Sequence, residues 1–214
     1  SYGVVAESVG SGGGLVVTGD SVSHVVGKGT GIGGEVSVNV NASITVSGTG
    51  AKGVYARSVG LSDPNVTVAA GQSVIGNNGA TAVEIVGSLN QLNNLGTIGV
   101  VNTSTDNAIS ISGGGSPSVT STILNRGTIV GNIDVEGAVS FSNTSTGAVY
   151  AGPSVNIGTN TLQNDGLLAS RAMNGSAIAP TYITGSIVQG STGVLEVRVD
   201  QASGTRDLFK ISGS

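Results

Sequence analysis

The sequence contains no cysteine, no tryptophan and few charged residues. The absence of cysteine excludes disulfide bonds and thiolate metal sites. Charged residues make up 9% of the 214 residues, against about 25% in typical soluble domains. The eight lysines and arginines are scattered singly and the net charge is −4, whereas nucleic-acid binders concentrate basic residues on one face. We therefore expect no nucleic-acid partner, and no residue cluster predicts a cofactor.

Aromatic residues and long apolar runs are also scarce. No apolar run approaches the roughly 18 residues that indicate a membrane-spanning helix, and the chain does not open with the charged and apolar regions of a signal peptide. The mean hydropathy is +0.27, and valine, isoleucine and leucine recur in every segment, so the composition is not that of a disordered chain. The aromatic residues are Tyr2, Tyr55, Phe141, Tyr150, Tyr182 and Phe209.

The most informative pattern that is present is an eight-residue stretch that occurs twice. Residues 3–10 read GVVAESVG and residues 53–60 read GVYARSVG, so six of the eight positions agree at a spacing of 53 − 3 = 50 residues. Strand-like units at a fixed period are typical of a solenoid, because such a unit buries its apolar side only against its neighbours.

Alternation of apolar and polar residues predicts β-strands along the whole chain. Residues 35–48 read EVSVNVNASITVSG, and this period of two is typical of a half-buried strand. A weaker version covers residues 15–26 and is broken at Gly19 and Asp20. Further strands are predicted within residues 66–69, 82–86, 108–112, 119–124, 135–141 and 195–199.

A shorter motif of the form N-x-G-x-[IL] marks corners between strands. Asparagine tolerates the left-handed backbone region and bonds to nearby backbone, glycine supplies a positive φ, and the following apolar residue returns to the core. Asparagines at equivalent corners of stacked units can bond to one another in a ladder. The motif centres on Asn94 and Gly96, on Asn125 and Gly127, and on Asn164 and Gly166.

Together these patterns predict an all-β fold, a right-handed parallel β-helix. With about 24 residues per coil the chain makes about nine coils, the 50-residue repeat covers two of them, and the rod is about 40 Å long. Low charge suits this geometry, because like charges on adjacent coils repel by about 3 kcal/mol at an effective dielectric constant near 20. A β-sandwich is the structural alternative, although it favours tight hairpins and a more aromatic core.

With these motifs in hand, the chain resembles the passenger region of bacterial autotransporters, the pertactin-like β-helix proteins of type V secretion. The stretches at residues 3–10 and 53–60 are similar to a G-[IV]-x-A-x-S-[VI]-G repeat of large autotransporter adhesins, and the N-x-G-x-[IL] corners also look like those of the family. Residues 193–200 and 207–213 are similar to the passenger end, where an autochaperone region precedes a membrane barrel.

The resemblance implies a β-helical passenger segment over residues 1–185 and the start of an autochaperone-like region over residues 186–214. It implies secretion through the outer membrane, display on the bacterial surface, and a C-terminal outer-membrane barrel as partner. We interpret the chain as a piece of a larger protein, because it starts within a motif and stops just after a strand. Deletion of residues 186–214 is expected to slow or abolish folding of the remainder.

Three functions remain open from the sequence. The first is a non-catalytic adhesin or adhesin stalk that attaches to host matrix or cell-surface molecules. The second is a self-associating stalk that joins neighbouring cells. The third is a polysaccharide hydrolase or lyase centred on Asp134 and Glu136, whose spacing puts both on one side of a strand, although a solvated strand surface explains the pair more simply. His24 is the only histidine, and we interpret it as a polar packing position.

Overall fold

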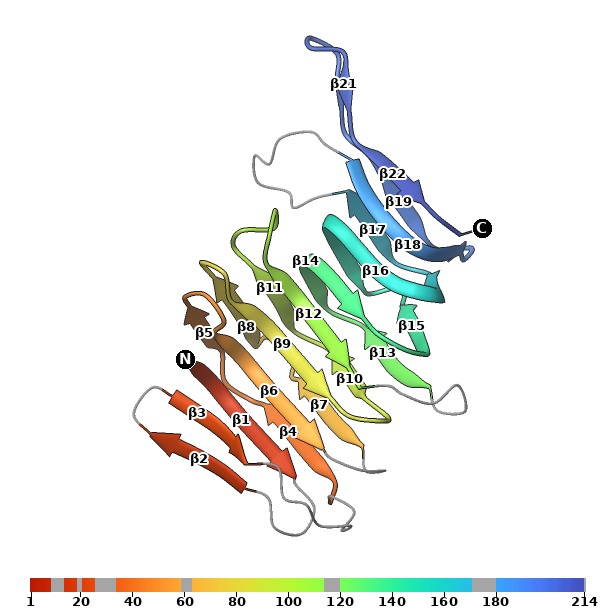
Figure 1. The fold of residues 1–214 in the computed structure, drawn as a ribbon. Coiled ribbons are helices and arrows are strands. Elements are labelled where there is room, and N and C mark those ends of the chain that lie inside the picture. Colours follow the sequence, from red (N-terminus) through yellow and green to blue (C-terminus); the bar gives the residue numbers. More distant parts are fainter. Residues whose placement is uncertain are drawn as a thin grey trace.

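One large parallel β-sheet winds around an apolar core in the computed structural model and presents three faces, forming a parallel β-helix (Figure 1). The chain visits a first, a second and a third face in turn, and one circuit of the three faces is one coil. The structure describes residues 1–8, 14–18, 21–25, 34–58, 63–113, 120–170 and 180–213, and for residues 14–18 and 21–25 only the backbone.

The first face carries the copies of the eight-residue repeat. It consists of β1 (Tyr2–Ser8), β6 (Lys52–Ser58), β9 (Thr81–Val86), β12 (Asn107–Ser112), the end of β14 (Thr128–Val135), the middle of β16 (Ala148–Asn164), the start of β18 (Pro180–Gln189), and β22 (Leu208–Ile211).

The second and third faces follow the first within each coil. The second face consists of β4 (Val36–Val40), β7 (Pro64–Val68), β10 (Gln91–Asn94), β13 (Ser121–Asn125), β15 (Val139–Asn143) and the ends of β16 and β18. The third face consists of β5 (Ile44–Ser47), β8 (Ser73–Asn77), β11 (Thr97–Val100), the starts of β14 and β16, β17 (Leu167–Ser170) and β19 (Val194–Glu196).

The predicted alternation gives the core. β4 has the pattern buried, exposed, buried, exposed, buried, and one apolar residue per coil lies in register beneath the second face. This column fills the centre of the solenoid, and every pairing around it is parallel, which rules out the β-sandwich alternative. Its members are Val38, Val66, Leu92, Ile123, Phe141, Leu162 and the partly buried Ile187.

The number of coils is smaller than the sequence indicated. Among the described residues, the second and third faces have seven strands each and the first face has eight, which gives between seven and eight coils against the expected count of about nine. Coil length varies from 141 − 123 = 18 residues between Ile123 and Phe141 to 123 − 92 = 31 between Leu92 and Ile123. The expected count assumed that every residue follows the coil path, whereas two antiparallel hairpins leave it.

The interpretation of the 50-residue repeat is wrong, and the first hairpin explains why. The two copies of the eight-residue repeat lie on adjacent coils, since Val4 pairs with Val54 and Ser8 with Ser58. The repeat therefore spans one coil plus an insertion, not two coils. Within that insertion β2 (Gly14–Thr18) and β3 (Ser21–Val25) pair antiparallel with each other, so the weak alternation of residues 15–26 forms a hairpin and not a coil strand.

The second hairpin lies near the C-terminus, where a single strand was predicted over residues 195–199. β19 ends at Glu196, and β20 (Val199–Asp200) then pairs antiparallel with β21 (Thr205–Arg206). This hairpin projects away from the sheets (Figure 1). Arg198 closes its base by two hydrogen bonds to buried Asp207, Nε to Oδ2 at 2.6 Å and Nη2 to Oδ1 at 3.1 Å.

Some strands bend from one face to the next without a loop. β14 does so at Gly131 and β18 at Gly185, with φ of 130° and 131°, backbone conformations that favour glycine. The predicted division after residue 185 thus falls inside β18. No helix among the described residues is long and apolar enough to cross a membrane.

Candidate functional site on the second face

The predicted corner asparagines come together in one buried column between the second and third faces. Asn94 donates from Nδ2 to Oδ1 of Asn125 at 2.8 Å, Asn125 donates to Asn143 at 2.8 Å, and Asn143 donates to Asn164 at 2.7 Å. All four side chains are completely buried. The column holds consecutive coils in register at this corner.

Every side-chain N–H group of the column has an acceptor, and every side-chain oxygen accepts a hydrogen bond. The second N–H of each amide reaches a backbone oxygen on the following coil, such as Thr128 for Asn94 and Leu167 for Asn143, both at 3.0 Å. At the ends of the column, Asn94 Oδ1 accepts from the Gly96 amide at 3.2 Å and Asn164 Nδ2 donates to Gln189 Oε1 at 3.0 Å. A buried amide that lost one of these partners would destabilise the fold, because its removal from water would no longer be offset by a hydrogen bond.

The sequence motif missed Asn143. Its glycine, Gly147, lies four residues later rather than two, so the pattern N-x-G does not match. A better signal is the inward apolar residue two positions before each asparagine, as in Ile123 and Asn125 or Phe141 and Asn143.

The corner glycines serve a purpose different from the expected one. None of Gly96, Gly127 and Gly166 has a positive φ, and among the described non-glycine residues only Asn78 does. These glycines instead allow close approach between coils. A Cβ at Gly127 would lie 2.1 Å from the Gly96 oxygen, and a Cβ at Gly166 would lie 2.2 Å from that of Gly147. The coils therefore pack closely at this corner, and the strands of the third face begin in register with one another.

Beside this corner lies the outer surface of the second face, which is polar and uncharged. None of the strand segments of this face contains Asp, Glu, Lys or Arg. In register, Asn65, Gln91 and Thr122 form one row, and Thr67, Asn93 and Leu124 form a second row beside it. Because parallel strands repeat about every 4.8 Å, equivalent polar groups recur at that interval along the rod.

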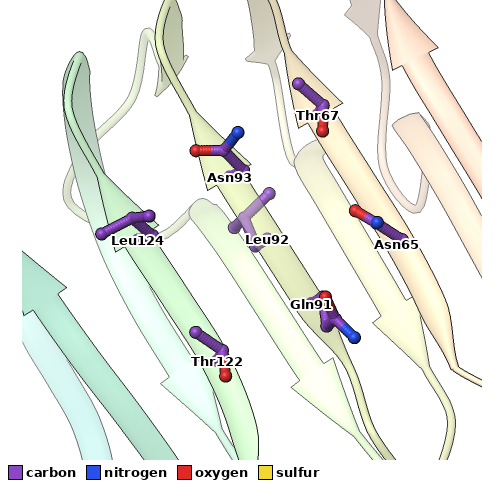
Figure 2. Close-up of a pocket in the computed structure, with 7 residues that line it drawn as sticks. All are labelled: Asn65, Thr67, Gln91, Leu92, Asn93, Thr122 and Leu124. Atoms are coloured by element: carbon purple, nitrogen blue, oxygen red, sulfur yellow. The ribbon is translucent and has the colours of Figure 1, made fainter.

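Figure 2 shows that these two rows line a shallow hollow on the outside of β7, β10 and β13. Its volume is about 210 Å³, and Leu92 lies beneath it. Gln91 and Thr122 are exposed at one end of the hollow, and Asn65 and Leu124 are half-buried. Arg126 lies beside it and donates to Asn93 Oδ1 over 3.4 Å.

Charge is concentrated on the first face instead. Lys52 forms an ion pair with Glu84 on the next coil, and Arg57 Nη1 lies 2.8 Å from Glu7 Oε1 on the preceding one. Tyr55 lies among these groups and is 7% exposed. Burial raises the pKa of Tyr55 above its ordinary value near 10, Arg57 opposes the increase, and Glu84 and Glu7 add to it.

The residues considered for catalysis do not form a cluster. Asp134 on β14 accepts a hydrogen bond from Asn156 Nδ2 at 2.8 Å, and Glu136 is exposed just beyond the end of that strand. The described residues contain no group of three or more histidine, aspartate or glutamate side chains placed to hold a metal ion. His24 is on β3 opposite Leu15, and its side chain lies outside the described part.

Comparison with known proteins finds no family model, no curated protein and no solved structure that matches this chain. The resemblance to autotransporter passengers therefore rests on the repeat at residues 3–10 and 53–60, on the corner motif and on the segments at residues 193–200 and 207–213. Among the described surfaces of the β-helix, the uncharged second face is the candidate functional site.

Proposed function

We propose that this chain is a non-catalytic, extracellular segment of a bacterial autotransporter passenger that acts as an adhesin or as the stalk of one. The observation that carries the proposal is the second face, whose described strand segments contain no charged residue over seven coils. A long, regular and polar surface suits attachment through many weak contacts better than it suits the enclosed chemistry of an active site.

The interior supports the role of a stalk. Each coil buries its apolar residues only against its neighbours, so stability accumulates along the rod. The asparagine column adds a continuous hydrogen-bonded line through Asn94, Asn125, Asn143 and Asn164. A segment built in this way holds a distal region at a fixed distance from the cell without any bound cofactor.

The proposed location and partners follow from the resemblance. The segment is displayed on the bacterial outer membrane by a C-terminal barrel, and its partners are host matrix or cell-surface molecules. A chain without cysteine suits export in an extended form, because no disulfide closes a loop before passage.

Self-association between neighbouring cells is the second candidate function, and the same face favours it. Two copies that meet through these uncharged strands oppose no like charges within the contact itself. This candidate predicts oligomers whose size rises with protein concentration in light scattering. A strict monomer at high concentration would count against it.

Surface display tests these proposals directly. A non-adherent bacterium would display the chain with and without residues 1–185, and attachment to immobilised matrix proteins and to sister cells would be counted. We expect attachment that depends on residues 1–185. A folded segment that mediates no attachment would restrict its role to that of a stalk. Turnover of a polysaccharide that is lost in Asp134→Ala would instead establish the enzyme and contradict the proposal.

A further inference from the structure

We propose that the hollow on the second face binds a neutral glycan chain. This inference rests on the proposed adhesive function, and it adds the chemical class of the ligand. The hollow is formed by Asn65, Thr67, Gln91, Asn93, Thr122 and Leu124.

The first argument is the contrast between the inner and outer polar side chains of the same strands. The inward amides of Asn94 and Asn125 are fully bonded within the column. By contrast, the side chains of Asn65, Gln91 and Thr122 have no hydrogen-bond partner within the described part of the chain. The outer row therefore presents unused donors and acceptors side by side. A ligand that satisfies both kinds of group carries many hydroxyls, since each hydroxyl donates and accepts.

The second argument concerns charge. No strand of the second face contributes an ionised side chain to the hollow. Beside the hollow, the guanidinium of Arg126 is directed to Asn93. Recognition of an anionic ligand depends on several basic groups or on a paired guanidinium, and the hollow offers neither. The ligand that fits is uncharged.

The third argument is the placement of apolar groups. Leu124 lies in the second row next to Asn93, and Leu92 lies beneath both. A sugar ring has hydroxyls around its edge and C–H groups on its faces, so the row of amides can bond the edge while Leu124 contacts a face. The chain has no tryptophan, and we therefore expect each sugar unit to be held weakly.

The fourth argument is repetition along the rod. The rows continue on the next coils as Ser140 and Thr161 in one and as Ser142 and Gln163 in the other. A linear polymer that lies along the axis meets a similar set of polar groups on each coil. Weak contacts to successive sugar units then add, because the later ones form at high effective concentration.

Affinity electrophoresis of the intact chain tests this inference. The gels would contain a galactomannan or a xyloglucan as neutral probes, or polygalacturonate as an anionic probe. The double variant Asn65→Ala/Gln91→Ala removes two adjacent groups of the outer row. Ser73→Ala/Thr97→Ala is the matched control, because these two residues pair on adjacent coils of the third face.

We expect a neutral probe to retard the protein, with about tenfold weaker affinity for the double variant, since each lost hydrogen bond weakens binding several-fold. The control is expected to bind like the parent chain. Both variants are to be checked by circular dichroism, and Thr122→Ala, also exposed, replaces the double variant if that one fails to fold. The inference would be overturned if neither neutral probe retards the protein, or if only polygalacturonate does. Equal retardation of the double variant and the parent chain would also overturn it.

The outcomes also separate this inference from the adhesive function. Cell attachment that the double variant does not reduce, together with no retention by either neutral probe, leaves the adhesin in place without a glycan site. Retention by a neutral probe without cell attachment leaves the glycan site and removes the adhesive role. If the chain forms oligomers through the second face and neutral glycans do not disrupt them, the ligand of this face is a second copy of the chain and not a glycan.

Discussion

Glu7 and Arg57 occupy the same position in the two copies of the eight-residue repeat, and they form an ion pair of 2.8 Å between adjacent coils. Only two positions differ between the copies, Val5 against Tyr55 and Glu7 against Arg57. Glu7 and Arg57 thus have complementary charges. Two residues of the same charge at these positions would lie one strand spacing apart and repel each other.

Removing one partner of this pair is expected to destabilise the fold. The Glu7 side chain is 2% exposed, and Arg57→Gln removes its ion-pair partner on the adjacent coil, which we expect to cost about 2 kcal/mol. The exchange Glu7→Arg/Arg57→Glu should recover more than half of the loss. Urea unfolding of both single variants, the neutral double variant and the exchange measures the coupling. A coupling near zero would show that the pair contributes nothing.

The asparagine column predicts a large effect of a small substitution. Asn125→Ala leaves Asn94 Nδ2 without its acceptor and Asn143 Oδ1 without its donor, and we expect a loss of about 3 kcal/mol in the free energy of unfolding. Asn39→Ala is the control, since Asn39 is an exposed residue of the same face. Similar unfolding free energies for the two variants would contradict the role of the column.

The corner glycines predict steric sensitivity without backbone strain. Gly127→Ala places a Cβ 2.1 Å from the backbone oxygen of Gly96, so the coils have to separate, and we expect a loss of about 3 kcal/mol. At Gly34 the nearest atom to an added Cβ is 3.5 Å away and φ is not positive. Gly34→Ala should therefore leave the melting temperature within a few degrees of the parent's, and an equal decrease in both variants would refute the steric explanation.

Tyr55 predicts a loss of stability at alkaline pH. Because burial raises its pKa in the folded state, the unfolded chain releases the phenolic proton first, from about pH 10 upward. The folded state then binds more protons than the unfolded state, so stability is complete below pH 10 and falls as the pH rises towards the folded pKa. Tyr55→Phe should lessen this fall, as measured by urea unfolding between pH 8 and 11.5. Parallel curves for the two proteins would contradict it.

The first hairpin is predicted to be dispensable for the fold. Its strands pair only with each other among the described residues, and Gly14 lies opposite Val25, so its two ends are close together. Replacing residues 14–25 by two glycines should keep a single cooperative unfolding transition and the far-ultraviolet spectrum of a β-protein. A broad or multiphasic transition would indicate that the hairpin contributes to the solenoid.

The sequence was sufficient for the class of fold and for the inward positions. The alternation around Val36, Val38 and Val40 reflects burial on one side only, and burial is the signal that a periodic pattern reports. The assumed coil length of about 24 residues is close to the observed mean, since (187 − 38)/6 is about 25 residues from Val38 to Ile187. Both properties are set by residues close to one another in the chain.

The remaining features depend on contacts between coils, which no local pattern reveals. Gly127 is a glycine because of an oxygen 31 residues earlier, at Gly96. The pattern of residues 15–26 does not distinguish the hairpin of β2 and β3 from a coil strand, because side chains alternate with a period of two in antiparallel and parallel strands alike. The hollow beside Gln91 arises only when three coils are stacked in register.

The asparagine column also has a consequence for how such a rod changes in length. Each rung donates towards the C-terminal neighbour and accepts from the N-terminal one, so every internal rung offers the same connectors above and below. A whole coil can therefore be duplicated or lost between Asn125 and Asn143 without redesign of either side. Recombination can then change the length of the rod in steps of one coil, while the terminating contacts at Gly96 and Gln189 stay unchanged.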